Sequence, residues 1–278
     1  MSRRRRWDLP TIFGGLIILA LVGTAALAPY LAPFPEDVKE THPAQRLQPP
    51  SLRHPFGTDS LGRDLLSRVL FGGRITLTVC TVVMGASLLL GVPAGLLSGY
   101  FEGAVSDIVM RLCDIFLSIP QVILAMALAY GLGPSLPNMM LALSLTYWPF
   151  FARIIAAEVR SLKKSLFVES TEALGVRTEQ IVVLHLLPNV LSSIIVRTSL
   201  GMGFTILTAA TLGFLGLGAR PPVPEWGVTI AEARHFLPGA WWYATFPGLA
   251  IFLVVMGFNL LGDGLRDILD PRIRKAAR

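Results

Sequence analysis

Long stretches without a charged residue alternate with polar connections along the chain. Asp, Glu, Lys and Arg are absent from residues 9–35, 75–101, 115–152, 198–219 and 236–262. An α-helix needs about 20 mostly apolar residues to cross a bilayer, because each residue rises about 1.5 Å and the hydrocarbon core is about 30 Å thick. Four of these stretches suit one such helix each. The stretch 115–152 is long enough for two, with a Gly- and Pro-rich break at 131–137.

The pattern therefore predicts an all-α integral membrane protein with six transmembrane helices. The expected spans lie near residues 11–33, 75–100, 106–130, 138–157, 189–217 and 240–261. Composition agrees, because only 15% of the residues are charged, whereas a soluble domain has about 25%. Mean hydropathy is +0.62. A large soluble protein with buried helices rarely repeats uncharged runs of this length, which excludes that class.

Basic residues gather in three segments that an even number of spans places on one side of the membrane. They precede the first span, separate the fourth from the fifth, and follow the sixth: Arg3, Arg4, Arg5 and Arg6; Arg160, Lys163, Lys164 and Arg177; Arg266, Arg272, Arg274, Lys275 and Arg278. The positive-inside rule makes this side cytoplasmic, so both termini are expected inside, in the cytoplasmic (inner) membrane. The loop 34–74 is an exception, since it is expected outside yet holds six basic residues.

The chain divides into two parts in this interpretation. Residues 1–74 form an N-terminal cytoplasmic tail, the first span and an outer loop, and residues 75–278 form a five-span core. In the outer loop, Leu61, Leu65, Leu66, Val69 and Leu70 recur at helical spacing, with Arg63, Asp64 and Arg68 off that stripe. This spacing predicts a short helix in the outer interface, which Gly72-Gly73 would end.

The second span carries glycines four residues apart, so they lie on nearly one face of a helix. They are Gly91, Gly95, Gly99 and Gly103. Glycine ridges let two helix backbones approach closely where lipid supplies no hydrophobic drive for association. We expect a helix–helix contact on this face.

Motifs of hydrolytic, redox or metal chemistry do not occur. The histidines have no metal-ligand spacing, the two cysteines suit apolar packing, and no G-x-x-x-x-G-K-[ST] phosphate loop is present. We therefore expect no catalytic residue and no metal or cofactor bound by this chain, which is not an enzyme in this interpretation. Arg197 is the charge that lies deepest in an expected span, so it either reaches the inner surface or lines a solute path.

The connection 158–188 between the fourth and fifth spans predicts a helix–glycine–helix hairpin. Residues 162–174 read as a short amphipathic helix, Gly175 supplies the left-handed residue that ends helices, and Thr178 starts a second one. Such a hairpin is either a solvated connection or a rigid knob that another protein grips.

This hairpin resembles the E-A-A…G…L-P signature of binding-protein-dependent ABC importer permeases. The residues that carry the resemblance are Glu169, Ser170, Thr171, Glu172, Ala173, Leu174 and Gly175, followed by Leu187-Pro188. Ser170 and Thr171 stand where the family usually has two alanines. Residues 54–68, which contain Gly57-Thr58-Asp59 and Gly62-Arg63-Asp64, look like the dipeptide/oligopeptide/nickel permeases in their C-type subunit. Residues 214–227 and 259–272 are similar to that subfamily too.

The resemblance implies a type I importer half, made of one N-terminal span and a five-span core. Expected partners are a homologous second permease, two ABC ATPase subunits that hold ATP and Mg, and an extracytoplasmic solute-binding protein, with no nucleic acid. Residues 169–175 would form the coupling segment that contacts an ATPase. Peptides are the expected solute, and nickel or a metal-chelator complex is the alternative. An ion-coupled secondary transporter would need several ionisable residues in mid-span, where Arg197 is the one candidate.

Overall fold

The structure is a computed structural model that describes residues 8–269. Arg3–Arg6 and the basic residues after Asp270 lie outside the described residues. The described chain is almost entirely helical: α1 Leu9–Ala26, α2 Ala28–Leu31, α3 Leu65–Tyr100, α4 Ala104–Ser118, α5 Gln121–Leu132, α6 Leu136–Lys163, α7 Leu166–Ala173, α8 Thr178–Gln180, α9 Leu187–Phe214, α10 Trp226–Ala233 and α11 Trp241–Leu269. A π-helical segment, Ile181–Leu186, joins α8 to α9.

Five helices are long and apolar enough to cross a membrane, and a bent pair makes up to six. The five are α1, α3, α6, α11 and the continuous helical run Thr178–Phe214, and the bent pair is α4 with α5. The count agrees with the six spans that the uncharged stretches predict.

The third expected span is not one straight helix. Helices α4 and α5 meet at a break after Ser118 and are bent by 91°. Pro120 has no backbone N–H, and its ring disfavours the helical conformation of the residue before it. Ile119 accordingly has extended backbone angles, with φ −100° and ψ 133°. The span expected near 106–130 is therefore made of two helices, which this proline separates.

The separate interfacial helix expected in residues 61–70 is also wrong, because α3 continues from Leu65 to Tyr100. Its start is capped by Asp64, whose side chain accepts a hydrogen bond from the Ser67 N–H. Gly72 and Gly73 lie inside the helix and are buried. A Cβ on Gly72 would overlap the indole of Trp226. The glycine therefore serves close packing against α10 and does not end the helix.

Residues 162–174 do not form one helix, because they are divided between the end of α6 and the separate helix α7. Helix α6 runs on to Lys163, and α7 begins at Leu166 after a turn at Lys164-Ser165. The connection that follows α6 is thus shorter and more tightly folded than the sequence pattern suggests.

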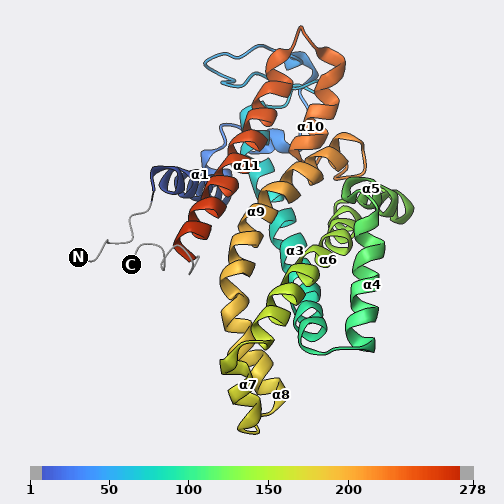
Figure 1. The fold of residues 1–278 in the computed structure, drawn as a ribbon. Coiled ribbons are helices and arrows are strands. Elements are labelled where there is room, and N and C mark those ends of the chain that lie inside the picture. Colours follow the sequence, from blue (N-terminus) through green and yellow to red (C-terminus); the bar gives the residue numbers. More distant parts are fainter. Residues whose placement is uncertain (1–7, 270–278) are drawn as a thin grey trace, which may run out of the picture.

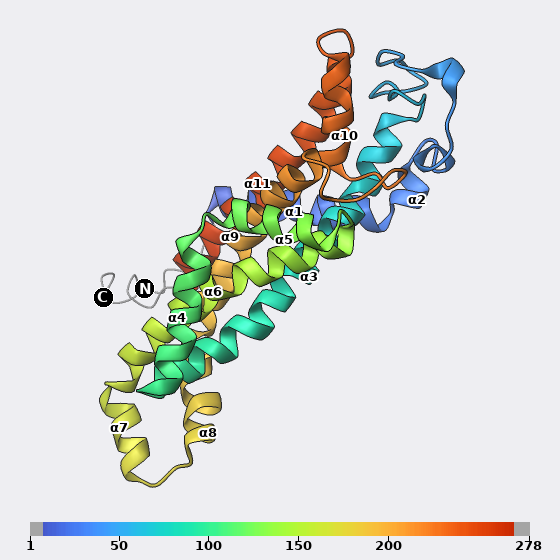
Figure 2. The same ribbon diagram turned by 90° about the vertical axis from the view of Figure 1, so that its right-hand side faces the viewer.

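The helices pack into an elongated body with distinct structures at its two ends. Helices α7 and α8 form one end, and the outer loop with α10 and the start of α11 forms the other (Figure 1). The same separation is visible after a quarter turn (Figure 2). Helix α3 packs along α6 in the main core, and α1 lies against α11. The α1–α11 contact is close because a Cβ on Gly14 would lie 2.8 Å from the Gly257 carbonyl oxygen.

Candidate functional site

Three glycines of α3 lie where α6 crosses it. A Cβ on Gly95 would lie 2.7 Å from the Ile155 Cβ and 2.8 Å from the Ala152 carbonyl oxygen. Gly91 and Gly99 meet α6 one turn earlier and one turn later, against Phe151 and Val159. The backbones of α3 and α6 can approach this closely because these positions lack side chains.

Gly103 does not belong to this contact. Helix α3 ends at Tyr100, and a Cβ on Gly103 would meet nothing within 4 Å. Gly103 has φ +78° and precedes the first residue of α4. Its place in the four-residue repeat is incidental, and its left-handed backbone forms the turn between α3 and α4.

The hairpin of α7 and α8 is attached to the ends of the long helices through the side that faces them. Val168 is fully buried and belongs to the same apolar cluster as Val159, Ile181 and Leu186. The Tyr100 hydroxyl at the end of α3 donates a hydrogen bond of 2.9 Å to the Glu172 carboxylate. The hairpin is therefore tied to α3, α6 and α9, and a force on it reaches those helices.

The side of the hairpin that faces away from the long helices presents apolar side chains to solvent. Leu166 and Leu174 are 80% and 83% exposed, and Phe167 is 42% exposed. Gly175 ends α7 with φ +74°, and the N–H groups of Leu174 and Gly175 donate to the carbonyls of Ser170 and Glu172. Of the predicted coupling residues, Glu169, Ser170, Glu172, Ala173, Leu174 and Gly175 are exposed and Thr171 is half-buried. Large exposed apolar side chains on a rigid knob are typical of a protein-binding surface.

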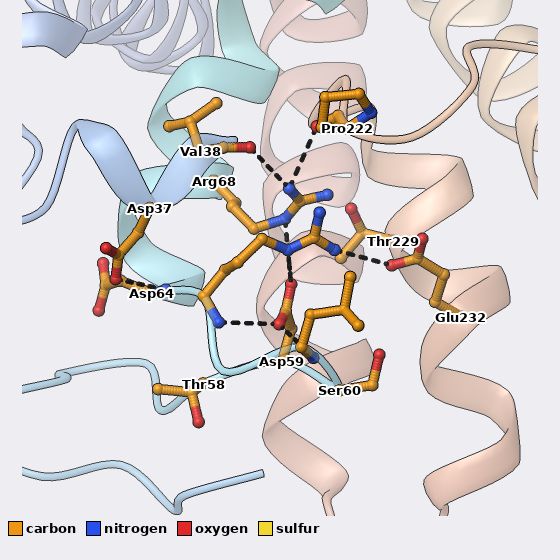
Figure 3. Close-up of polar contacts among 12 residues, drawn as sticks. Asp37, Val38, Thr58, Asp59, Ser60, Asp64, Arg68, Pro222, Thr229 and Glu232 are labelled. Carbon is orange, nitrogen blue, oxygen red and sulfur yellow. Dashed lines mark hydrogen bonds and ion pairs between the residues drawn. The ribbon is translucent and has the colours of Figure 1, made fainter. Parts of the chain in front are cut away.

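The opposite end contains a network of buried charges centred on Asp59 (Figure 3). Asp59 is fully buried and accepts hydrogen bonds from the N–H groups of Leu61 and Arg63 and from the Arg63 Nε at 2.6 Å. Arg68 Nε lies 3.4 Å from the same carboxylate, and the Arg63 Nη2 lies 3.5 Å from Glu232 of α10. Arg63 and Arg68 are each 1% exposed.

This network connects segments that are far apart in the sequence. Arg68 Nη1 donates to the carbonyl oxygens of Val38 and Pro222. The indole N–H groups of Trp242 and Trp226 donate to the carbonyls of Thr58 and Val69. The outer loop, the start of α3, α10 and the start of α11 are thereby joined into one cap.

The sequence pattern suggested that Arg63, Asp64 and Arg68 form the polar face of an interfacial helix, which is wrong. All three are buried, and Asp64 also accepts a hydrogen bond from His54, which is 1% exposed. In the same loop, the His42 Nε2 and an Asp37 carboxylate oxygen form a hydrogen bond of 2.9 Å. The signal that could have revealed this network is the density of paired charges and glycines in residues 57–68.

Glu225 closes the cap on the α9 side. Its carboxylate accepts the N–H groups of Gly227 and Val228 at the start of α10. Burial raises the pKa of Glu225, and the two N–H donors oppose that rise. Gly213 and Gly227 leave room for Glu225 and for the Ala210 carbonyl, respectively. Gly213 and Gly227 thus permit one close contact between α9 and the start of α10.

Arg197 lies in α9, ten residues after its start and so about 15 Å along its axis. It borders an open cavity of about 270 Å³ between α5, α6 and α9, lined by Gln121, Tyr147, Phe150, Arg197, Leu200, Gly201 and Phe204. Its Nε is buried, and no residue of the described chain accepts a hydrogen bond from it. A charged side chain within a bilayer span costs about 3 kcal/mol even by the lower scale.

Comparison with protein families gives two matches that together cover most of the chain. Residues 91–275 match the model described as binding-protein-dependent transport system inner membrane component. Residues 11–50 match the N-terminal transmembrane domain of oligopeptide transport permease C.

Several transport system permease proteins are similar to nearly the whole chain. A dipeptide transport system permease of Alkalihalophilus pseudofirmus is 42% identical over 263 residues, which are 95% of this chain and 86% of that protein. A glutathione transport system permease of Pectobacterium atrosepticum is 42% identical over 95% of this chain and 87% of its own length. A probable D,D-dipeptide permease of Escherichia coli is 42% identical over 94% and 87%.

The fold is similar to that of the methionine ABC transporter MetNI in inward-facing conformations. One such structure has a TM-score of 0.58 at 20% identity and covers 76% of this chain and 96% of its own. At this identity the likeness concerns the fold alone. The family match and the relatives establish that the chain belongs to the binding-protein-dependent transport system inner membrane components and is a multi-pass permease subunit of an ABC importer.

Proposed function

We propose that this chain forms half of an ATP-driven importer for short peptides. Its partners are a homologous second permease, two ATPase subunits and an extracytoplasmic solute-binding protein. The relatives described above are named for dipeptides and glutathione, which favours a peptide over nickel or a metal chelate. ATP hydrolysis belongs to the ATPase subunits, and this chain supplies part of the path.

The hairpin is the observation that carries the proposal. It combines exposed apolar side chains, Leu166, Phe167 and Leu174, with a firm attachment to the long helices through Val168 and Glu172. The attachment matters because a docking surface that moved independently of the long helices could not pass the movement of an ATPase on to them. The face of residues 169–175 is proposed to sit in a groove of one ATPase, on the cytoplasmic side.

Transport then follows from rigid-body movement. Closure of the ATPase pair on ATP displaces the hairpin, and α6 and α9 tilt with it because they are packed to it. Packed helices switch between discrete arrangements and do not deform continuously. The path between the two permeases opens alternately to the outside and to the inside.

Two substitutions in the hairpin test the coupling role. Gly175→Pro is incompatible with φ +74°, since proline fixes φ near −65°, and Glu169→Lys reverses an exposed charge. We expect each to lower peptide uptake into proteoliposomes at least tenfold, and to abolish the stimulation of ATP hydrolysis by the loaded binding protein. The basal ATPase rate is expected to persist.

Glu102→Lys is the matched control. Glu102 is an exposed acid at the same end of the molecule, outside the hairpin, and its 3.4 Å pair with Lys163 is solvated. Such exposed pairs contribute only about 0–1 kcal/mol. Normal uptake by both hairpin variants would contradict the proposal.

A further inference from the structure

The Arg197 side chain makes no ion pair and no hydrogen bond with any of residues 8–269. It is half-buried in α9, its Nε is buried, and none of residues 8–269 accepts a hydrogen bond from that atom. The two buried arginines at the other end, Arg63 and Arg68, differ in that each has a carboxylate oxygen within 4 Å, from Asp59 or Glu232. A cation in a membrane span that has no partner among the described residues is a candidate binding site for an anion from outside the chain.

The cavity beside Arg197 is partly open and has both apolar walls and polar groups. Phe150 and Phe204 are 40% and 43% exposed and give the cavity apolar walls. Gln121 reaches the same cavity because the break at Pro120 starts α5 there. Tyr147 packs against Phe204 and lies beside Gly201, where a Cβ would be 2.7 Å from its hydroxyl oxygen. The site thus offers one fixed cation, polar groups beside it, and aromatic surface.

We propose that Arg197 binds the carboxylate of the transported solute, and that the aromatic walls contact the rest of it without selecting one side chain. A guanidinium presents N–H donors in a planar fork that matches a carboxylate. The cavity volume of about 270 Å³ suits a group the size of one or two amino-acid residues. This inference rests on the proposed function and names the solute group that the permease itself recognises.

Direct binding to the permease–ATPase complex tests the proposal without the binding protein, which has its own specificity. The complex of this chain with its second permease and ATPases is placed in nanodiscs without nucleotide. Equilibrium dialysis then measures radiolabelled alanyl-phenylalanine and its C-terminal amide. We expect the free acid to bind the wild-type complex at least tenfold more tightly than the amide.

Variants assign the effect to the guanidinium. Arg197→Gln is expected to weaken binding of the acid to the level of the amide and to leave amide binding unchanged within twofold. Arg197→Lys keeps the charge but loses the fork, so it is expected to restore part of the difference. Arg220→Gln, which removes an exposed arginine from the connection between α9 and α10, is expected to change neither.

Equal binding of acid and amide, absent binding of the acid, or equal weakening of both ligands by Arg197→Gln would overturn the proposal. Loss of the second permease from purified Arg197→Gln would also overturn it, because Arg197 would then pair with that subunit. Peptide uptake driven by ATP in the wild-type system is measured separately. Its failure would remove the proposed function, whereas intact uptake with an indifferent Arg197 would remove this inference alone.

Discussion

Asp59 shows how a single residue organises the outer end of the molecule. One carboxylate accepts two backbone N–H groups and faces both Arg63 and Arg68, all without contact with water. Buried charges are tolerated when they are paired and hydrogen-bonded, and removal of one partner leaves the others uncompensated. The loop 34–74 was an exception to the positive-inside rule because it holds six basic residues. Arg63 and Arg68 are two of these six, and both pair with Asp59.

Asp59→Asn is therefore expected to destabilise the protein by about 3–5 kcal/mol, because Arg68 loses the carboxylate it pairs with and Arg63 keeps only its 3.5 Å contact with the partly exposed Glu232. The measurement is the temperature at which half of the purified complex loses its monodisperse peak in detergent. Glu40→Gln, which neutralises an exposed acid of the same loop, is the control. A midpoint for Asp59→Asn equal to that of the control would show that the network is dispensable.

At the scale of elements, the contact between α3 and α6 depends on position and not on glycine content. Gly85 and Gly95 both lie within α3, yet a Cβ on Gly85 would meet nothing within 4 Å while one on Gly95 would press on α6. Periodicity shows which residues share a face, and it does not show where along that face the partner helix crosses.

The pair of substitutions Gly95→Ala and Gly85→Ala separates these effects. Gly95→Ala is expected to destabilise by about 1–3 kcal/mol, because the methyl group forces α3 and α6 apart. Gly85→Ala is expected to be neutral or to stabilise by about 0.5–1 kcal/mol, since alanine favours the helix. Thermal stability of the complex measures both, and equal effects would refute a close α3–α6 contact at Gly95.

At the scale of the whole molecule, the hairpin and the outer cap lie at opposite ends of the helices (Figures 1 and 2). The first is attached to α3, α6 and α9, and the second joins α3, α10 and α11. Helix α3 spans both, so a tilt that begins at the hairpin reaches the cap along a continuous helix. The proposed orientation puts the hairpin in the cytoplasm and the cap outside.

Cysteine labelling tests that orientation. Leu52 and Leu174 are fully and 83% exposed, and the native Cys80 and Cys113 are buried and are replaced by serine. A membrane-impermeant maleimide is expected to label Leu52→Cys in intact spheroplasts and Leu174→Cys only in inverted vesicles without ATPase. Labelling of Leu174→Cys from outside would reverse the topology and end the coupling proposal.

The sequence by itself determined the number of spans, their approximate limits and the place of the hairpin. These follow from properties of neighbouring residues: the length of an uncharged run against the thickness of a bilayer, and a glycine such as Gly175 at the end of a helix. Family resemblance added the kind of protein. It did not show which face of any helix is buried.

Only the tertiary structure decided which charged residues of the outer loop are buried and which glycines lie in helix contacts. Arg68 looked like a polar-face residue because Pro222, which accepts from it, lies 154 positions away in the chain. Gly72 looked like a helix end because Trp226, which fills its space, is equally distant. Arg197 gained its cavity from α5 and α6. Burial depends on partners that are distant in sequence, and local periodicity contains no record of them.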